Sequence, residues 1–150
     1  MQLVLIEPEI PQNTGNIARL ALALGAELWL VGSLGFSLTE KHLRRSGMDY
    51  WAQVKLVRIA TLDEYYERMH PESAFISSKG TRAYTALPSD TGALVFGNES
   101  AGLPSEFYEK YPAKLYRIPM CEGVRCLNLS SAAAITAYHL ASVNNFELLF

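Results

Sequence analysis

Three polar, glycine-containing segments carry the side chains best suited to chemistry in this 150-residue sequence. They are residues 7–16 (EPEIPQNTGN), 97–104 (GNESAGLP) and 119–128 (PMCEGVRCLN). Glycine lets backbone N–H and C=O groups come close to a ligand, so these segments favour binding of a small molecule. Asn16 and Arg19 are three residues apart, which puts both on one face of a helix that begins in the first segment. The alternative for this stretch is a capped helix whose arginine covers apolar surface.

Several common catalytic signatures do not occur in the sequence. Residues 97–104 lack the Gly-Lys-Ser/Thr of a phosphate-binding P-loop and the G-x-G-x-x-G of a dinucleotide turn. No G-x-S-x-G nucleophile elbow is found. The two cysteines and three histidines show no zinc-ligand spacing, so we expect no metal. Cys126 as a nucleophile remains a minor alternative.

Short apolar runs alternate with helical patterns, and these elements must position the three segments. Strands are expected at residues 3–6, 28–31, 54–59, 74–77, 93–96 and 115–118. Helices are expected at residues 13–24, 39–45, 61–69, 105–111 and 128–144. This alternation predicts an α/β fold with a mostly parallel sheet flanked by helices. Ligands of such sheets bind at the carboxyl ends of the strands, where we expect all three segments to lie.

Composition is that of an ordinary globular protein. Hydrophobic residues make up 49% of the chain and charged residues 19%, and no apolar run reaches the ~18 residues that span a bilayer. The length fits a single domain over residues 1–150. The acidic start is unlike a secretory signal, and two cysteines build no disulfide framework. We therefore expect a cytoplasmic protein without a membrane partner.

Charge is unevenly distributed along the chain. The net charge of −2 gives no nucleic-acid signal for the whole protein. Residues 41–82, however, hold eight Lys and Arg against five acids. A local basic face of this kind collects phosphates. A solvated helix surface is the alternative.

Taken in order, the three segments resemble the three motifs of the SPOUT methyltransferases, in the TrmH-like 2′-O-ribose branch. The similarity is closer still to the TrmL (YibK-like) tRNA methyltransferases of the wobble nucleotide. It is carried by residues 7–19, 43–50 (LRRSGMDY), 78–81 (SKGT), 96–104, 118–120 (IPM) and 125–130 (RCLNLS). These matches keep their order over nearly the whole chain.

The resemblance implies an α/β-knot, in which the C-terminal part of the fold threads a trefoil knot that no hydrophobic pattern reveals. The knot loops hold S-adenosyl-L-methionine (AdoMet), and the product is S-adenosyl-L-homocysteine. By position, the resemblance places six residues around the cofactor: Ile76, Gly97, Ile118, Met120, Cys126 and Leu127. It also implies a homodimer with the first and last helices in its interface, which the apolar residues 131–143 suit.

The implied reaction is methyl transfer to a ribose 2′-hydroxyl. This hydroxyl is a poor nucleophile and must lose its proton as it attacks, so the enzyme can supply positioning and proton removal. Arg19 is the implied catalytic residue. Because a guanidinium is a very weak acid, a charged Arg19 that orients the hydroxyl or a phosphate is easier to accept than a deprotonated base. Asn16 and Asn128 would hold the neighbouring geometry, and Tyr138 would position a nucleotide or serve as an interface aromatic.

Cys126 departs from the pattern, because family members commonly have serine there. A backbone contact to AdoMet survives the exchange, but a side-chain hydrogen bond to the catalytic group weakens, since a thiol is a poor donor and acceptor. tRNA is the expected partner, and its exposed anticodon-loop bases suit recognition by stacking and edge contacts. Phosphate contacts are expected from Arg44, Arg45, Lys79 and Arg82.

The expected activity is 2′-O-methylation of tRNA wobble nucleotide 34, a cytidine or modified uridine, with tRNA-Leu favoured by the resemblance. The same chemistry at another RNA site is one alternative, against which the minimal length and residues 43–50 argue. An AdoMet- or RNA-binding module without catalysis is another. Intact Arg19 and Asn128 argue against this second alternative, whereas Cys126 leaves it some room.

Overall fold

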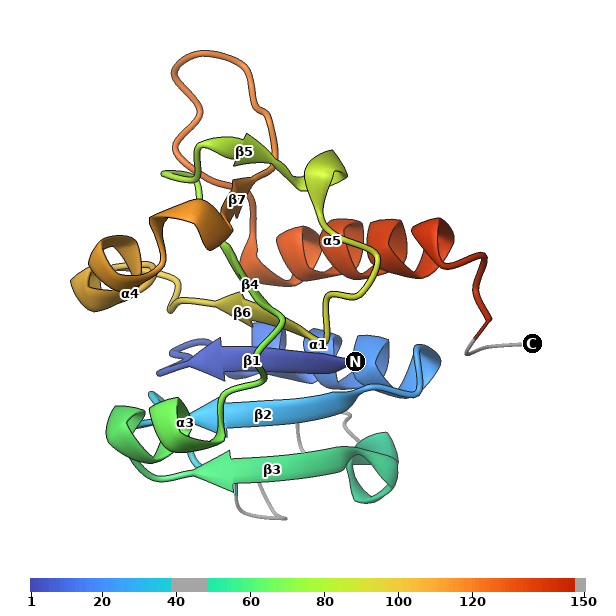
Figure 1. Ribbon diagram of the computed structural model, residues 1–150. Coiled ribbons are helices and arrows are strands. Elements are labelled where there is room, and N and C mark those ends of the chain that lie inside the picture. The colour runs from blue at the N-terminus through green and yellow to red at the C-terminus, as the bar shows by residue number, and fades with distance from the viewer. Residues whose placement is uncertain (39–48, 148–150) are drawn as a thin grey trace.

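The computed structural model describes residues 1–38 and 49–147, and a parallel sheet of seven strands forms its centre (Figure 1). The strand order is β3-β2-β1-β6-β4-β7-β5, and all neighbours run parallel. The strands are β1 (Gln2–Ile6), β2 (Glu27–Val31), β3 (Lys55–Ile59), β4 (Ser73–Ile76), β5 (Arg82–Ala83), β6 (Ala93–Phe96) and β7 (Leu115–Arg117). Because all strands point the same way, their carboxyl ends lie at one edge.

Helices cover both faces of the sheet. On one face lie α1 (Pro11–Ala23) and α5 (Leu129–Val143), and on the other lie α3 (Leu62–Arg68) and α4 (Ser105–Lys110) (Figure 1). Three short 3-10 helices complete the described elements: η1 (Asp49–Gln53), η2 (Tyr84–Ala86) and η3 (Pro112–Lys114). Loops at the carboxyl edge are thereby held between two helical layers.

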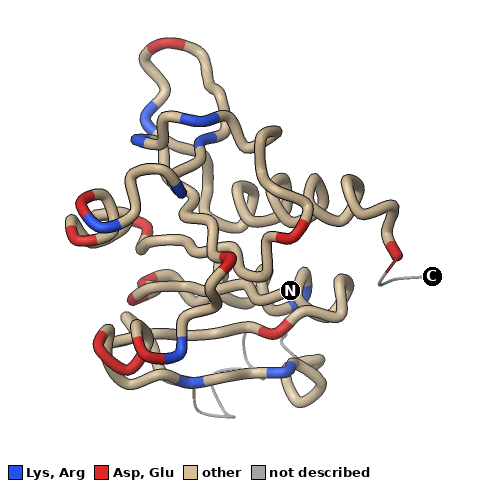
Figure 2. Tube along the Cα trace, viewed as in Figure 1, with Lys and Arg blue, Asp and Glu red and all other residues tan. Residues whose placement is uncertain are grey.

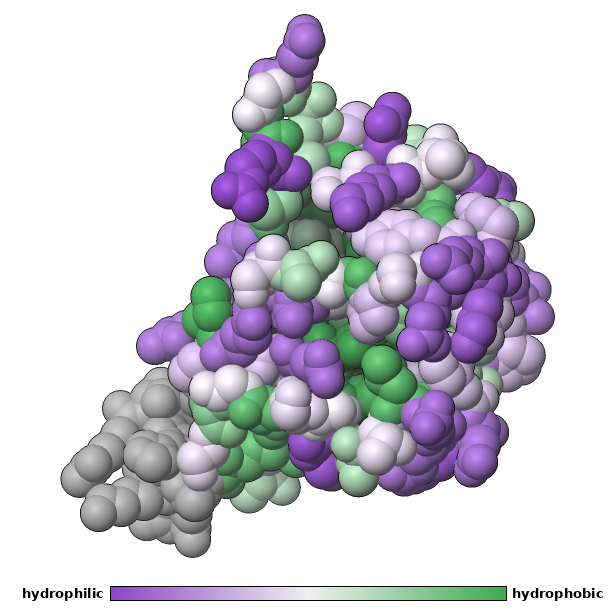
Figure 3. Space-filling view, turned by 90° about the vertical axis from the view of Figure 1, so that its left-hand side faces the viewer, coloured by the Kyte–Doolittle hydropathy of each residue, from purple (hydrophilic) through white to green (hydrophobic). Residues whose placement is uncertain are grey.

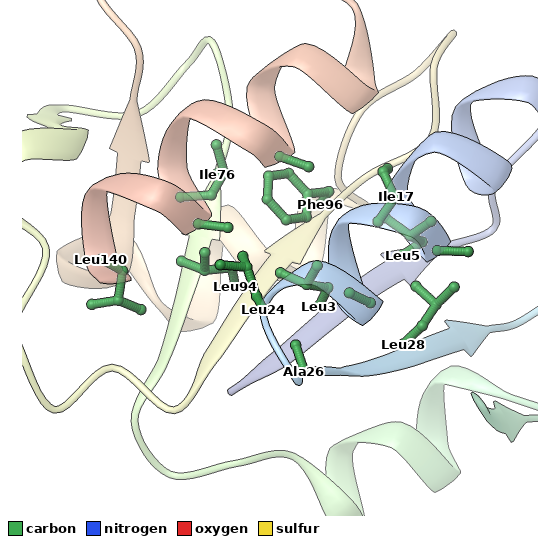
Figure 4. Packing of buried hydrophobic residues seen from close by; sticks show 14 of the residues in the cluster. Leu3, Leu5, Ile17, Leu24, Ala26, Leu28, Ile76, Leu94, Phe96 and Leu140 are labelled. Atoms are coloured by element: carbon green, nitrogen blue, oxygen red, sulfur yellow. The ribbon is translucent and has the colours of Figure 1, made fainter. Parts of the chain in front are cut away.

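Alternate side chains of the central strands enter two separate cores. In β1, Leu3 and Leu5 pack toward α1 and α5, whereas Val4 and Ile6 pack toward α3 and α4. All four are buried, which explains why these strands read as unbroken apolar runs. Figure 4 shows the first core, in which side chains of α1 and α5 meet those of β1, β2, β4 and β6.

Helix ends largely follow local signals. The hydroxyl of Thr61 caps α3 and the side chain of Asn128 caps α5. The φ of Gly25 is +61°, a conformation that glycine adopts freely and that ends α1. α1 begins two residues before the helix expected over residues 13–24. Ile10 is the N-cap residue and makes no side-chain capping bond, while Asn13 lies inside the first turn.

The α/β class with a parallel sheet flanked by helices is confirmed. All six expected strands are present, as are the helices expected at residues 13–24, 61–69, 105–111 and 128–144, with ends shifted by at most two residues. The helix expected at residues 39–45 lies outside the described residues. β5 was not expected, because a strand of two residues leaves no periodic pattern. The trefoil knot stays a prediction.

Two features are absent from residues 1–38 and 49–147. No helix there is long and apolar enough to cross a bilayer. In the same residues, no three His, Cys, Asp or Glu side chains gather as a metal ion would require. Both cysteines, Cys121 and Cys126, are free thiols on the exposed loop that follows β7.

Candidate active site

A pocket of about 570 Å³ lies at the carboxyl edge of the sheet. This volume falls within the roughly 300–1,000 Å³ of small-molecule sites. The pocket is lined from residues 76–79, 96–103, 118, 120 and 125–129, together with the first turns of α1 and α5 and one side chain of α4. Figure 3 looks onto this edge and shows a hollow beneath a projecting loop, with hydrophilic side chains around it. The segments singled out in the sequence therefore converge on one site.

The position of the pocket follows from the strand order. From β1 the chain first builds outward through β2 and β3, and it then returns to place β6 on the other side of β1. The loops after β1 and β6 thus leave the sheet side by side in opposite directions. In parallel sheets this reversal opens a crevice in which ligands bind.

Gly97 lies directly after β6, where its loop folds back on itself. The N–H of Asn98 donates to the carbonyl of Gly102 at 3.2 Å, and the N–H of Gly102 donates to the carbonyl of Asn98 at 3.1 Å. A Cβ atom on Gly97 would lie 2.0 Å from the carbonyl carbon of Gly102 and 2.1 Å from the nitrogen of Leu103. Only glycine fits this close approach, so bare backbone forms this part of the pocket wall.

Glu99 ties the same loop to the segment that precedes α1. Its carboxylate accepts hydrogen bonds from the backbone N–H groups of Glu9 at 2.8 Å and Ile10 at 3.2 Å, and from Nδ2 of Asn13 at 2.9 Å. In return, the carboxylate of Glu9 accepts from the N–H of Ser100 at 3.1 Å and from its hydroxyl. Glu99 therefore supplies, from a distant segment, the cap that α1 lacks locally.

Asn13 continues this network to α5. Its buried side chain donates to Glu99 and accepts, through Oδ1, a hydrogen bond from Nδ2 of Asn128 at 2.9 Å. Oδ1 of Asn128 accepts from the N–H and hydroxyl of Ser130 at 2.9 and 2.7 Å, which caps α5. A chain of hydrogen bonds therefore joins all three loops of the pocket.

Ser77, Lys79 and Tyr108 form one corner of the pocket, called the Lys79 corner below. Oγ of Ser77 lies 2.9 Å from the Tyr108 hydroxyl oxygen and accepts the backbone N–H of Lys79 at 3.2 Å. Nζ of Lys79 lies 5.3 Å from the centre of the Tyr108 ring, in cation–π range. All three residues line the pocket, so the ammonium group is held at its wall.

The pocket brings together the residues that sequence reasoning placed at the cofactor. Those that line it are Ile76, Gly97, Ile118, Met120, Cys126 and Leu127. Asn128 and Lys79 line it as well. That these residues bind AdoMet stays a prediction, but one pocket holds them all.

Three of the expected catalytic residues do not line the pocket. Arg19 and Asn16 lie on the exposed face of α1, as their spacing predicted. The guanidinium of Arg19 lies 4.6 Å from the centre of the Tyr50 ring, and the Tyr50 hydroxyl donates to the carbonyl of Gly15 at 2.6 Å. Tyr138 is 44% exposed on α5. Arg19 is thus held by an aromatic ring beside the site, rather than covering apolar surface alone.

Of the expected RNA-binding residues, the structure describes Lys79 and Arg82, and several Lys and Arg positions gather near β5 and the loop after β7 (Figure 2). Lys79 lies in the pocket wall, whereas Arg82 lies on the edge strand β5 and donates to the hydroxyl of Tyr116 at 2.9 Å. Arg44 and Arg45 lie outside the described residues. Their role, like that of the catalytic residues, stays a prediction.

Sequence reasoning missed Glu99 and Tyr108. The signal for Glu99 was a carboxylate between two glycines directly after a strand, a position that the sequence alone does not connect to α1. Tyr108 lies in a short helix whose exposed and buried positions alternate without a motif, so no local pattern marks it. Both residues acquire their role from the strand order, which brings β6 beside β1 and α4 beside the loop after β4.

Comparisons with known proteins agree with this geometry. A tRNA (cytidine(34)-2′-O)-methyltransferase of Acidovorax sp. is 41% identical over 150 residues, covering 96% of this chain and 92% of the relative. A solved structure described as giving insights into the 2-OH methylation of C/U34 on tRNA has a TM-score of 0.85 at 38% identity and covers 96% of both chains. An AdoMet-bound rRNA methyltransferase from Sinorhizobium meliloti has a TM-score of 0.82 at 25% identity, over 95% of this chain and 56% of its own.

The family match extends over most of the chain. Residues 1–138 match the SpoU rRNA methylase family. This range contains all three motif segments and ends within α5. A match of this extent, with relatives near 40% identity, shows the family. The chain belongs to the SpoU rRNA methylase family, and it is a methyltransferase of the SPOUT class.

Proposed function

We propose that this protein transfers a methyl group from AdoMet to the ribose 2′-hydroxyl of wobble nucleotide 34 of tRNA. The observation that carries the proposal is the convergence of three motif loops on one pocket, in a chain 41% identical to a tRNA (cytidine(34)-2′-O)-methyltransferase. Within this proposal the target base is cytidine or a modified uridine, tRNA-Leu is the leading substrate, and the reaction takes place in the cytoplasm.

The residues of the pocket fit AdoMet, which joins an adenine ring to a charged methionine tail. Apolar side chains that suit the ring line the pocket, namely Ile76, Ile118, Met120 and Leu127. Cationic and polar side chains line it too, including Lys79 and Asn98. The bare backbone at Gly97 offers carbonyl and N–H groups to the adenine edge. An AdoMet-bound structure of the same family at 25% identity supports this cofactor.

The cofactor, when bound, supplies an electrophilic methyl group on a sulfonium sulfur. The 2′-oxygen forms a bond to that methyl carbon while the carbon–sulfur bond breaks, and the hydroxyl proton is released. Guanidinium groups are poor bases, so the role of Arg19 in this proposal is to orient the hydroxyl or the adjoining phosphate. Asn16 shares its exposed face and contacts the same nucleotide. Since both side chains are exposed, the released proton has a direct path to water.

Asn128 acts on this arrangement through Asn13. Its amide holds the Asn13 side chain, which is hydrogen bonded to Glu99 beside the pocket. Asn13 and Arg19 lie in the same helix, so the network that fixes the start of α1 also fixes the backbone position from which the Arg19 side chain extends. Asn13 and Arg19 are six positions apart, which at 1.5 Å per residue is roughly 9 Å along the helix axis.

A homodimer is the proposed assembly. The outer face of α5 exposes apolar side chains, with Ile135 at 37%, Tyr138 at 44% and Val143 at 43% exposure. A face of this kind on a helix that already packs beside α1 suits burial against a second copy. Tyr138 shares this face, which favours the interface role over nucleotide contact. Light scattering of the purified protein tests the assembly, and a monomer at micromolar concentration would contradict it.

tRNA is the proposed partner, contacted along its backbone by Arg82 and by Arg44 and Arg45. The guanidinium of Arg82 is held by Tyr116, with the ring centre at 4.9 Å, and is exposed at the edge of the sheet. An arginine held in this way is available to a phosphate without a large loss of side-chain freedom.

The test is transfer of labelled methyl from AdoMet to bulk tRNA from cells that lack this protein, followed by nuclease mapping of the label. Label on the ribose of nucleotide 34 is the expected result. Label at another ribose of tRNA would favour the alternative target. Bound AdoMet without transfer to any RNA would favour a non-catalytic module.

A further inference from the structure

We infer that Lys79 is the anion site of the cofactor pocket and binds the carboxylate of the methionine tail. This inference rests on the proposed use of AdoMet, and it gives Lys79 a role in cofactor binding in place of the RNA contact expected from the sequence. A carboxylate ligand in a pocket needs a cation or a set of N–H donors to replace its water. Lys79 offers three N–H donors and a positive charge in the pocket wall.

The Lys79 corner is built to hold the ammonium group in place. The backbone of residues 77–80 is fixed by the Lys79 N–H on Oγ of Ser77 and by the N–H of Gly80 on the carbonyl of Ser77 at 3.0 Å. Gly80 packs so tightly on β7 that a Cβ atom would lie 2.5 Å from the carbonyl carbon of Tyr116. The loop that carries Lys79 therefore has little freedom to move away from the pocket.

The ring of Tyr108 sets the direction of the lysine side chain. Nζ lies 5.3 Å from the ring centre, and the Tyr108 hydroxyl is anchored 2.9 Å from Oγ of Ser77. A lysine that rests on an aromatic ring keeps its charge and loses less side-chain freedom when a ligand binds. Ser77, Lys79 and Tyr108 all line the same pocket, so the ammonium group is presented to whatever fills it.

The charge balance of the pocket leaves Lys79 free for a ligand anion. Glu99 is the only carboxylate among the described lining residues, and neutral donors from Glu9, Ile10 and Asn13 occupy both of its oxygens. Within the described residues, no ion pair joins Lys79 to an acid. Arg125 also lines the pocket, but no contact within the described residues holds its side chain. Of the two cations, Lys79 is the one already positioned.

The test is calorimetric binding of two ligands, S-adenosylhomocysteine and its decarboxylated analogue, to the wild type and to Lys79→Met. Wild-type protein that binds S-adenosylhomocysteine upholds the proposed cofactor, and failure to bind would contradict that proposal rather than this one. We expect Lys79→Met to weaken the binding of S-adenosylhomocysteine by about tenfold, the usual effect of one charge-assisted hydrogen bond. The binding of the decarboxylated analogue should not weaken. Lys79→Arg should restore most of the affinity, since it keeps the charge.

Lys110→Met is the matched control, because Lys110 also lies over a tyrosine ring, that of Tyr66 at 4.5 Å, but outside the pocket. It should bind both ligands as the wild type does. Equal weakening of both ligands by Lys79→Met would show a structural role and overturn the inference, as would unchanged binding of S-adenosylhomocysteine. Loss of carboxylate-dependent affinity in Arg125→Gln, with Lys79→Met unaffected, would overturn it in favour of Arg125.

Discussion

Glu9 and Glu99 hold each other's loops together beside the pocket. The carboxylate of Glu99 accepts the N–H of Glu9 at 2.8 Å, and the carboxylate of Glu9 accepts the N–H of Ser100, the residue after Glu99, at 3.1 Å. Within the described residues, neither carboxylate takes part in an ion pair. The clasp is therefore made of hydrogen bonds from neutral donors, and it joins the loops of two strands, β1 and β6, that are 90 residues apart in the chain.

Glu99→Gln should weaken this clasp without removing the side chain. A glutamine keeps one acceptor oxygen, but its amide nitrogen cannot accept a hydrogen bond. An N–H group that Glu99 satisfies would then lose its acceptor, at a cost of about 1–3 kcal/mol. We expect the free energy of unfolding, measured in urea, to fall by that amount and the affinity for S-adenosylhomocysteine to fall with it. Glu109→Gln, on the exposed side of α4, should change neither quantity. Wild-type stability and binding in Glu99→Gln would contradict the clasp.

Asn128→Asp separates the two roles of Asn128. Aspartate caps a helix about as well as asparagine, so α5 should keep its stability. The amide that donates to Asn13 is lost, and a carboxylate oxygen would face Oδ1 of Asn13 instead. We expect a melting temperature close to that of the wild type together with at least a tenfold lower kcat/KM for methyl transfer. Asn128→Ala should lower both the melting temperature and kcat/KM, since it also removes about 1 kcal/mol of helix capping. Unimpaired transfer by Asn128→Asp would remove Asn128 from the positioning network.

Gly97→Ala tests whether bare backbone forms the cofactor wall. The added methyl group would overlap the backbone of Gly102 and Leu103, so the loop must shift away from its closed shape. We expect at least a tenfold loss of affinity for S-adenosylhomocysteine by calorimetry, with the far-ultraviolet circular dichroism unchanged. Ala86→Ser, an exposed change outside the pocket, should bind normally. If Gly97→Ala bound as tightly as the wild type, the site would have to lie elsewhere.

Cys126→Ser restores the residue that family members commonly carry. If a side-chain hydrogen bond at this position assists transfer, the hydroxyl should raise kcat about threefold to tenfold, in line with roughly 1 kcal/mol for one bond. Cys126→Ala should match the wild type, because the thiol contributes little as donor or acceptor. Single-turnover rates at saturating AdoMet distinguish these outcomes. A lower rate in Cys126→Ser than in the wild type would show that the thiol itself is used.

The elements of the fold were largely predictable from the sequence, because buried parallel strands such as residues 3–6 and 93–96 are short, unbroken apolar runs. Their order in the sheet was not, since nothing in residues 93–96 tells which strands will be their neighbours. The same limit applied at the site. The three loops were recognisable by composition, whereas the contacts of Glu99 with Glu9 and Asn13 depend on β6 pairing with β1.

Two residues make tertiary contacts that their residue type alone does not indicate. Asn13 has the residue type of a helix cap, but Pro11 allows the helix to begin earlier, and Glu99 provides the cap from outside. Lys79 belongs to a basic stretch that favours phosphate contact, but the loop after β4 turns it toward Tyr108 and the pocket. In both cases a contact between distant segments, which the sequence does not show, determines where the side chain lies.

Arg19 is proposed to promote methyl transfer to the ribose of nucleotide 34, and this role can be measured on cellular tRNA. Mass spectrometry of tRNA from cells lacking the protein, complemented with the wild type or with Arg19→Ala, identifies the methylated atom and its position. We predict a 2′-O-methyl group on nucleotide 34 with the wild type, and its loss with Arg19→Ala although that variant still binds S-adenosylhomocysteine. A methyl group on a base or at another nucleotide, or full modification by Arg19→Ala, would contradict the account.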